Sequence, residues 1–467
     1  MREVQIQIEP FSYIALQKLR ISQNINNHGR AQIVMRIKDE WKESYIGTLA
    51  SPTWVKVIGK GEDGRGEAMY IVLFHGLVTD FSLQQNGYET ILTLILTSGT
   101  VLMDRKKHFR VFQNENADCR SIYQRLTSLY PKGKISIWED ERGKTNGVLI
   151  QHEETDWQFL KRLASRSGKY LVPINNQKGC GYTLGLPWGE KREIGRDKIR
   201  IQLNMEEYLT KQEKGLSGLT PLDMVEIIVT EREICYLGDF IDYDGKEYWI
   251  YHIETTYDGT ECLHTYYLKT KEALQVLASY HEGIAGTSFE AFITNVKKDK
   301  VQVEIEGDEW KGEDGQKWFL YSTVYSSPDG TGWYCMPEIG DSVRLYVPQK
   351  EEESFILSAV HKETDSSRQV PEHKSFKTKH GKELLFTPDT ILFTNNQGMT
   401  VEMNDQEGIS IMSDKDVTIE AKDSVTISSE AGSVLVAAEE ILQVAQGGTS
   451  MTLKEDISFT GGEFRIQ

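Results

Sequence analysis

Residues 409–467 carry a short repeat that limits how the chain can fold. Two apolar residues separated by one position recur every six to nine residues, with polar stretches such as Ser413–Asp416 between them. Alternation of this kind predicts short β-strands with one apolar face, each followed by a turn. The pairs are Ile409 with Ile411, Val417 with Ile419, Val425 with Ile427, Val434 with Val436, Leu442 with Val444, Met451 with Leu453, Ile457 with Phe459 and Phe464 with Ile466.

One such strand cannot bury its apolar face alone, and a row of them leaves a long apolar stripe in water. A step of about eight residues is also too short for one chain to close a solenoid turn, which takes about 20–25 residues in a parallel β-helix. We therefore expect other copies of the chain to cover the stripe. Three intertwined chains form a triangular prism without free lateral edges, and ten strands would make a rod of roughly 45 Å.

Composition excludes several classes of protein. The chain has 53 Lys and Arg against 70 Asp and Glu, a net charge of −17, so a binder of nucleic acid backbones is not expected. The acidic segment Glu304–Asp314 also argues against nucleic acid, although it lies in a predicted OB-type barrel. No apolar run reaches about 18 residues, and the N-terminus lacks the apolar core of a signal peptide. We expect synthesis in the cytoplasm and no membrane anchor.

No residue pattern predicts catalysis, a metal or a cofactor. The five cysteines lie far apart without a CxxC motif, and His252 and His264 are isolated on predicted strands. The acidic pairs at 153–154 and 351–353 are interpreted as a capping group and a solvated turn, because no cleft-forming framework accompanies them. Scattered reduced thiols fit a reducing compartment.

Two helices are predicted within an otherwise β-rich chain. The first is Cys119–Tyr130, and the second follows Thr155, where Gln158 completes a capping box and Gly168 ends the helix. A short helix is also expected within Glu272–Gly286. The block Gly61–Gly66 lies between two strands and predicts a hairpin loop, not a nucleotide site.

Strands are predicted on both sides of the two helices and in the small barrel that follows. They are Glu3–Ile8, Ala31–Ile37, Trp54–Ile58, Tyr70–Val78, Ile91–Leu96, Tyr170–Pro173, Met224–Val229, Tyr248–Ile253, Cys262–Leu268, Phe289–Val296, Lys300–Ile305, Lys317–Val324, Gly332–Met336, Ser342–Val347 and Ser354–Val360. The β-rich regions before and after the helices are alike in kind, so two related barrels are expected.

Three segments, in this order, resemble the VgrG spike family. Residues 153–170 resemble the helix signature of its hub, and residues 332–346 resemble the Trp…Pro-x-x-Gly-Asp-x-Val segment of its OB domain. Residues 377–386 followed by 408–421 are similar to the start of its β-prism spike. The resemblance implies a mainly β homotrimer with two hub β-barrels and inserted helices, an OB-fold barrel and a C-terminal intertwined triple-stranded β-helix.

The resemblance also implies domain boundaries and a mechanical function. The expected domains are a first hub barrel (1–100), a helical insert and linking region (101–205), a second hub barrel (206–284), an OB-fold domain (285–362), a linker (363–376) and a β-prism spike (377–467). The expected function is the central hub-spike of a contractile injection system, such as a type VI secretion apparatus, a phage tail or a phage-tail-like particle. It would join a sixfold tube to a threefold needle that pierces a target membrane and is ejected on firing.

The expected partners are two further copies of the chain, the inner tube protein, baseplate proteins and possible effector cargo. No lysozyme domain fits between the OB domain and the spike, and the sequence ends at Gln467 within the repeat without a closing His-x-His. A separate PAAR-like tip protein is therefore expected. Structural or trimer-interface roles are predicted for Trp157, Leu160, Trp333, Pro337, Gly340, Ile409, Ile411, Val417, Ile419, Val425, Ile427, Val434, Val436, Ile457 and Phe459, and Gly340 is also predicted as a turn residue.

Two other functions remain open from the residues alone. A polysaccharide-degrading enzyme on a parallel β-helix would need longer turns and a groove lined by acids. A passive trimeric receptor-binding fibre would share the C-terminal repeat but would need only a small N-terminal anchor. The molar mass in solution separates the enzyme from the two trimers, and imaging at the end of a tube separates spike from fibre.

Overall fold

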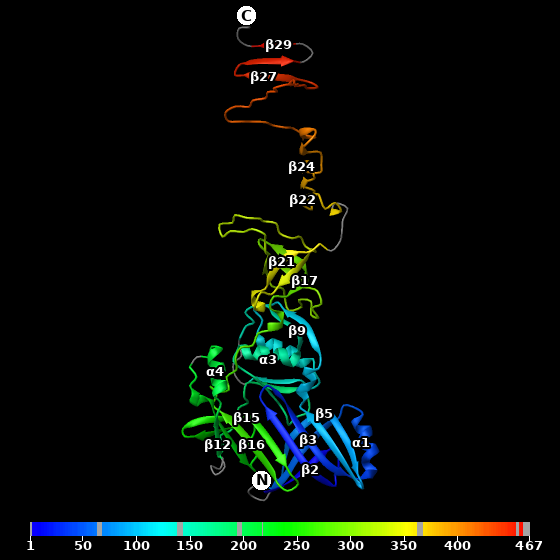
Figure 1. Ribbon diagram of the computed structural model, residues 1–467, viewed down its shortest axis with the longest axis vertical. Helices are drawn as coiled ribbons and strands as arrows, with labels where there is room; N and C mark the ends of the chain where they lie inside the picture. The colour runs from blue at the N-terminus through cyan, green and yellow to red at the C-terminus, as the bar shows by residue number, and fades with distance from the viewer. Residues whose placement is uncertain are drawn as a thin grey trace. The chain divides into compact units, whose positions relative to one another are not determined.

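Figure 1 shows the computed structural model, which describes residues 2–62, 68–137, 143–193, 199–216, 218–361, 368–453 and 457–460. The chain divides into two compact units, Met1–Lys362 and Glu363–Gln467. It is mainly β, as predicted, and among the described strands only β8 and β11 pair in parallel. The predicted hairpin loop at 61–66 lies mostly outside the described residues, but the strands that flank it, β4 and β5, pair antiparallel.

The first unit is built on an 11-stranded sheet that contains both predicted hub regions. Its order is β1-β4-β5-β6-β3-β2-β15-β16-β13-β12, with β14 paired to β15. The strands are β1 (Arg2–Glu9), β2 (Ala15–Asn24), β3 (Asn27–Ile37), β4 (Trp54–Glu62), β5 (Ala68–Asn86), β6 (Glu89–Thr97), β12 (Ile199–Leu203), β13 (Val225–Glu231), β14 (Phe240–Tyr243), β15 (Lys246–Tyr257) and β16 (Cys262–Lys269).

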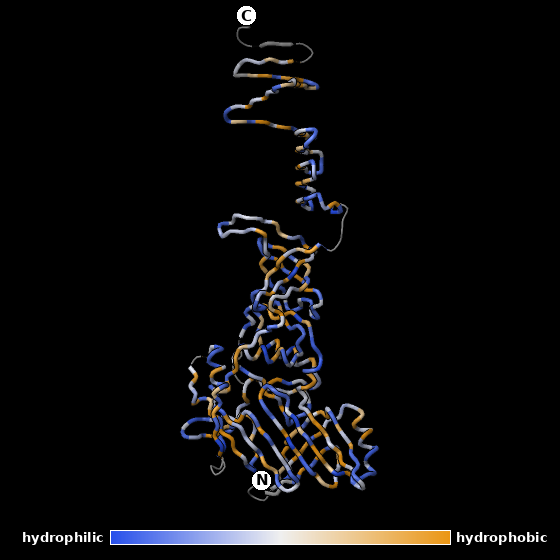
Figure 2. Tube along the Cα trace, in the orientation of Figure 1, coloured by the Kyte–Doolittle hydropathy of each residue, from blue (hydrophilic) through white to orange (hydrophobic). Residues whose placement is uncertain are grey.

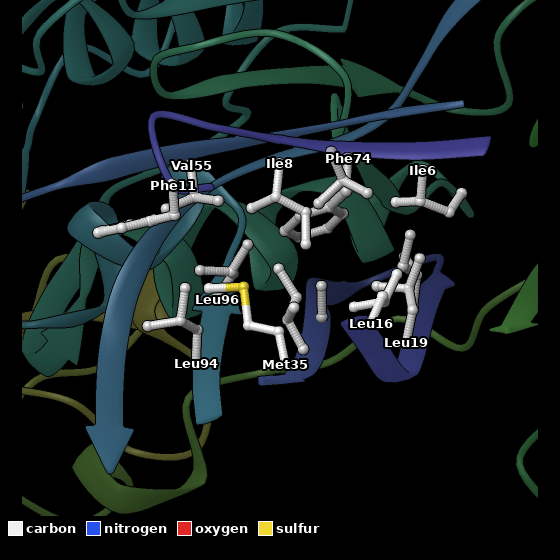
Figure 3. Close-up of a cluster of buried hydrophobic side chains, with 14 of the residues drawn as sticks. Ile6, Ile8, Phe11, Leu16, Leu19, Met35, Val55, Phe74, Leu94 and Leu96 are labelled. Carbon is white, nitrogen blue, oxygen red and sulfur yellow. The ribbon is translucent and has the colours of Figure 1, made fainter. Parts of the chain in front are cut away.

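The two halves of this sheet are joined by strands that are far apart in the sequence. β2 pairs antiparallel with β15, from Asn24 opposite His252 to Leu19 opposite Tyr257. Each half still has its own core: one surrounds Ile33, Phe74 and Leu94, and the other includes Ile250 and Tyr266. Figure 3 shows the first of these clusters. Two similar β regions were predicted, but the hydrogen bonding that joins them was not.

A helical insert follows the first half of the sheet. Its helices are α2 and α3, and α3 begins as predicted: Gln158 N donates to Thr155 Oγ1 at 3.2 Å, and Thr155 N donates to Gln158 Oε1 at 3.1 Å. Helix α2 ends at Ser128, two residues before the predicted end. The elements are the 3-10 helix η2 (Gly99–Asp104), β7 (Lys107–Phe112), α2 (Cys119–Ser128), β8 (Lys134–Ile137), β9 (Leu149–Thr155), α3 (Asp156–Arg166), β10 (Leu171–Pro173) and β11 (Gly181–Leu184).

Among the helices that were not predicted are two α-helices, each with a short 3-10 helix nearby. They are η1 (Asp39–Trp41), α1 (Lys42–Leu49), α4 (Met205–Glu213) and η4 (Pro221–Met224). Helix α1 buries only Leu49 and α4 buries no residue, so neither shows the apolar stripe by which an amphipathic helix is recognised.

The helix predicted within 272–286 was wrong. The structure has only the 3-10 helix η5 (Glu282–Ile284) there. The segment before η5 is held by the helical insert: Ser279 N donates to Ser165 Oγ at 2.9 Å, and His281 Nε2 lies 2.6 Å from the carbonyl oxygen of His152. These contacts replace the local hydrogen bonds that a helix would make.

The third part of the first unit is a small barrel of five strands in the order β19-β18-β17-β20-β21. Two predicted strands were wrong in extent: Lys317–Val324 reduces to Phe319–Leu320, and Gly332–Met336 forms no strand. Instead, residues 321–336 leave the barrel as a hairpin loop, here called the arm. The elements are β17 (Ser288–Lys297), β18 (Lys300–Ile305), β19 (Phe319–Leu320), β20 (Ser342–Tyr346), the 3-10 helix η6 (Glu351–Glu353) and β21 (Phe355–Ala359).

The second unit contains two antiparallel meanders separated by a long stretch without strands. The first meander begins at Lys374, inside the predicted linker 363–376. The strands are β22 (Lys374–Lys377), β23 (Glu383–Phe386), β24 (Thr390–Thr394), β25 (Thr400–Asn404), β26 (Gly408–Met412), β27 (Leu442–Gln446), β28 (Thr449–Leu453) and β29 (Ile457–Thr460).

The three strands predicted between the two meanders were wrong for the single chain. Residues 413–441 form no strand, because an isolated extended segment has no neighbouring strand with which to exchange backbone hydrogen bonds. The six apolar residues predicted to form these strands lie instead in extended, exposed chain: Val417 and Ile419, Val425 and Ile427, Val434 and Val436.

Candidate functional site

The first meander of the second unit exposes an apolar face. In each strand, side chains separated by one intervening residue point to this face. Across the sheet they align in two rows. One row is Phe376, Leu384, Phe393, Val401 and Ile411, and the other is Phe386, Ile391, Met403 and Ile409. Most of these side chains are exposed, Ile409 to 73% and Ile411 to 61%. A single-layer sheet with this face in water lacks its covering layer.

Three apolar pairs of this face were missed by the sequence analysis. Leu384 with Phe386, Ile391 with Phe393 and Val401 with Met403 have the same one-residue spacing as the pairs that begin at Ile409. The repeat therefore begins about 25 residues earlier than predicted, and the spacing of those three pairs is the signal that would have found them.

Residues 415–441 lack two things that a β-strand needs. Among the described residues, no surface buries their apolar side chains, and no neighbouring strand pairs with their backbone. The apolar side chains of the three pairs at 417–436 are between 51% and 72% exposed, with Ile419 at 72% and Val436 at 60%. No backbone N–H or carbonyl in 415–441 bonds to the backbone of any described residue. Figure 2 shows hydrophobic positions recurring along this extended trace. Exposed apolar side chains and backbone without backbone partners therefore occur together in this extended segment.

Within one chain, Ile419 and Val436 do not contact a surface that could form the predicted interface. Neither side chain is buried, and neither lies in a strand, because one copy of the chain supplies no surface against them. The same holds for Val417, Val425 and Val434, which are 51–58% exposed. Their interface role stays a prediction about the assembled protein.

The structure places the remaining predicted interface residues in different settings. Trp157 and Leu160 are buried in the core of the helical insert, where the Trp157 ring meets Tyr182 edge to face at 5.7 Å. Pro337 is buried, Gly340 forms a turn with φ +94°, and Trp333 lies exposed on the arm. Strand β29 contains Ile457 and Phe459, while Phe464 and Ile466 lie outside the described residues.

A buried ionic cluster joins helix α3 to the small barrel. Arg162, which is 5% exposed, donates to Glu351 Oε1 at 2.6 Å and to Glu154 Oε2 at 2.8 Å. Glu351 is 2% exposed, accepts from Ile150 N at 2.7 Å and also pairs with Arg166. Burial alone would lower the pKa of Arg162, but Glu351 and Glu154 outweigh it and raise that pKa, so the guanidinium stays charged.

The interpretation of residues 351–353 as a solvated turn, and of Glu154 as only part of a capping group, was wrong for two residues. Glu351 is buried and Glu154 is largely buried, because both are ion partners of Arg162, which is 189 residues from Glu351 and eight residues from Glu154. Glu153 and Glu353 are exposed, as interpreted. The charge of Arg162 is therefore compensated both by Glu154, just before α3, and by Glu351 of the barrel.

A second ionic cluster joins strand β7 to the loop after β18. Arg110 Nη1 donates to Asp156 Oδ1 at 2.6 Å, and Arg110 Nε donates to Glu309 Oε2 at 3.0 Å. His108 Nδ1 lies 2.8 Å from Glu309 Oε2. We call this cluster and the Arg162 cluster together the ionic junction. It joins the helical insert to the barrel at two places.

Acid is expected to weaken the second cluster. Burial alone would raise the pKa of Glu309, but His108 and Arg110 outweigh it and hold that pKa below its usual value. A carboxylate with a lowered folded-state pKa stabilises the fold above its unfolded pKa, about 4.3, and loses this contribution as the pH falls through the folded value. Glu309→Gln should therefore lower the thermal midpoint at pH 7, and the difference should shrink as the pH falls below about 4.3.

The exposed acid Glu313, on the same loop, supplies the control. Glu313→Gln should change the thermal midpoint little at either pH, because surface pairs contribute about 0–1 kcal/mol. Tryptophan fluorescence reports the unfolding. A Glu309→Gln effect of equal size at both pH values would contradict the proposed role of the Glu309 carboxylate.

A cavity of about 390 Å³ in the first unit contains the strongest chemical candidates, but they are poorly suited to catalysis. Cys235 and His264 both line it. Burial, with Asp239, raises the pKa of the Cys235 thiol to about 12, and burial lowers the pKa of His264 to about 4. At neutral pH the thiol is protonated, and the imidazole, whose Nδ1 lies 2.8 Å from Thr255 Oγ1, is a weak base.

Neither a group of metal ligands nor a membrane-spanning helix is present in the described part of the chain. Within it, no three His, Cys, Asp or Glu side chains are grouped as metal ligands would be. His252 lies on β15, 3.4 Å from Glu254 Oε1, and His264 lies on β16. None of the described helices is long and apolar enough to cross a bilayer.

Comparison with known proteins defines the class to which this fold belongs. Residues 62–173, from β4 to β10, match the family described as phage tail baseplate hub (GPD). No curated protein matches the chain. Among solved structures, the chain is similar to the E. coli c3393 protein, a component of the type VI secretion system with structural similarity to the T4 bacteriophage tail proteins gp27 and gp5. The TM-score is 0.52 at 13% identity, over 76% of this chain and all of that one.

A chain of the half-lidded Francisella PdpA-VgrG complex is also similar, with a TM-score of 0.56 at 11% identity over 88% of this chain and 87% of that one. The lidded form of that complex gives 0.57 at 11% identity, over 88% and 80%. Residues 62–173 thus match a phage tail baseplate hub domain, and the chain has a VgrG-like fold.

Proposed function

We propose that three copies of this chain form the central hub and spike of a contractile injection system. The proposal rests on one observation about the segment 415–441. Its apolar pairs are exposed, and its backbone has no backbone partner among the described residues. Three copies arranged about one axis supply both missing partners, because each apolar face turns inward and each strand pairs with a neighbouring chain. The fold and the baseplate hub match support the same assignment.

The hub is proposed to join tubes of different symmetry. Each chain contributes two half-sheets with separate cores, so three chains present six similar β regions to a sixfold tube. The expected partners are therefore the inner tube protein and baseplate proteins. The spike would lead the tube through a target membrane when the sheath contracts, and the chain would leave the cell with it.

The proposed role is mechanical and not enzymatic. The protonated Cys235 thiol and the weakly basic His264 support this view, as does the hub-spike fold. A separate PAAR-like tip protein and an effector cargo remain predictions. Co-purification of the chain with a small tip protein from the same particle tests the first of them.

Deletion of the gene, with microscopy of the producing cells, tests the proposed function. Cells without the chain should assemble no contractile particles that fire, and a plasmid copy should restore them. Immunogold against a tag on the chain should label the central axis at the baseplate end. Particles that assemble and contract normally without the chain would show that it is not the hub.

A further inference from the structure

The two halves of the large sheet repeat one strand order. In the first half the order is β4-β5-β6-β3-β2, and in the second it is β14-β15-β16-β13-β12, with every neighbouring pair antiparallel. The strands of each half also follow one another along the chain in the same way, from β2 to β6 and from β12 to β16. Strand β12 therefore corresponds to β2, and β15 corresponds to β5.

A β-bulge in each half fixes which residues correspond. Strand β5 has a bulge between Val78 and Asp80, where it pairs with β6, and β15 has one between Ile250 and His252, where it pairs with β16. A bulge shifts the register at one point, so it marks equivalent positions in the two strands. With the bulges aligned, the residues that lie opposite one another across each half also correspond. One such row is Val78, Leu96, Ala31 and Ile21 in the first half and Ile250, Leu268, Ile227 and Ile201 in the second.

The halves are joined within the chain along a part of β15 that β14 leaves free. Strand β14 pairs with residues 246–249 of β15, and β2 pairs with residues 252–257. In the first half, β4 pairs with β5 only as far as Leu77, so residues 80–86 have β6 on one side and no described strand on the other. Among the described strands, β12 likewise pairs only with β13. One chain therefore has both strands of a second junction, but it does not pair them.

The side chains at these two free edges are more exposed than their counterparts at the junction within the chain. Ile201 of β12 is 50% exposed, whereas its counterpart Ile21 of β2 is 2% exposed. Leu203, on the same face of β12, is 46% exposed. On β5, Leu83 is partly exposed, whereas its counterpart Thr255 of β15 is 3% exposed. Positions that the internal junction buries are thus open and apolar at the two free edges.

The two free edges of one chain are far apart. Six strands lie between β12 and β5 in the sheet order, which corresponds to roughly 30 Å along the sheet at about 4.8 Å per strand. Figure 1 shows β12 and β5 on opposite sides of this sheet. A contact between two different surfaces of identical chains closes into a ring when the rotation between the copies closes. In a trimer, each free β12 can therefore meet the free edge of β5 in the next copy.

We propose that β12 of each chain pairs antiparallel with residues 81–85 of β5 in the next copy, as β2 pairs with β15 within the chain. The register of the internal junction places Ile201 opposite Leu83 and Leu203 opposite Phe81. The contact would satisfy both free backbone edges and cover their exposed apolar side chains. This inference rests on the proposed trimer, and it names the strands through which the three hubs join.

Disulfide trapping tests this contact in the full-length protein. The same register places Arg200 opposite Gln84 on the other face of the pair, and Cα atoms of opposite residues lie about 4.5–5.5 Å apart, within reach of a disulfide. The exposed native Cys335 is first replaced by serine. Arg200→Cys combined with Gln84→Cys should then, on oxidation, shift most of the protein from the monomer band to dimer and trimer bands on a non-reducing denaturing gel.

Arg200→Cys combined with Gln5→Cys is the matched control. Gln5 is exposed on β1, the strand at the other end of the sheet order, so this pair tests whether β12 meets that edge instead. The control pair should stay in the monomer band, and so should Arg200→Cys alone. Mass spectrometry of the dimer band from the first pair should find positions 200 and 84 linked between two chains.

The outcomes separate this inference from the proposed function. A trimer in solution whose 200 and 84 positions do not link between chains would overturn the hub contact and leave the spike trimer intact. Links of equal yield from the Gln5→Cys pair would also overturn it, because they would show no preference for β5. A monomer in solution would overturn both proposals.

Discussion

Ile427→Asp is expected to leave the purified protein monomeric or aggregated instead of trimeric. Ile427 is 70% exposed in one chain, and in the proposed prism it turns toward the axis with its two counterparts. Leaving a buried charge unpaired costs about 3–5 kcal/mol, and the three carboxylates of a trimer would together cost roughly 10 kcal/mol or more. Light scattering coupled to size exclusion measures the change directly.

Thr426→Asp is the matched control for this prediction. Thr426 precedes Ile427 in the same extended segment, so its side chain points to the opposite face. The variant introduces the same charge one residue away and should remain trimeric. If Ile427→Asp formed trimers as stable as those of the control, the apolar pairs would not lie in an interface between chains.

Arg162→Met is expected to destabilise the first unit strongly without dissociating the trimer. The substitution leaves the buried Glu351 carboxylate with less compensation, and breaking a buried ion pair costs about 3–5 kcal/mol. All nine tryptophans lie before residue 362, so tryptophan fluorescence reports only this unit. The urea midpoint of the fluorescence transition should fall markedly.

Two further variants make the Arg162 result specific. Arg344→Met removes the partner of Glu290 in a half-exposed pair at 2.9 Å and should cost at most about 1 kcal/mol. Adding Glu351→Met to Arg162→Met should recover part of the loss, because no carboxylate then remains buried at that position. Equal effects of Arg162→Met and Arg344→Met would contradict a special role for the ionic junction.

Local features of the fold could be predicted from the sequence. The capping box of α3 needs only Thr155 and Gln158, three residues apart, and the apolar pairs need only alternation within one strand. Helices α1 and α4 could not be recognised in this way, because they bury almost nothing and lack a stripe.

Long-range features could not be predicted, because their partners are far apart in the sequence. Arg162 and Glu351 are separated by 189 residues, and nothing near either residue indicates the other. The pairing of β2 with β15 is of the same kind. The domain boundaries within the first unit stay predictions.

The segment from Val417 to Val436 illustrates a further limit of sequence-based prediction. Its apolar pattern, as at Val417 and Ile419, predicts strands, but one chain contains no backbone with which they could pair. A strand needs its hydrogen-bond partner as much as its apolar face. In the proposed trimer that partner belongs to another chain, so neither the sequence pattern nor a single chain completes these strands.

Sedimentation equilibrium of the full-length, folded protein tests the central claim most directly. If two sister chains cover the apolar pairs and pair with the backbone of residues 415–441, the measured mass should be three times that of the 53.3-kDa chain over a wide concentration range. A well-folded species with the mass of one chain, and no tendency to associate on concentration, would contradict the account.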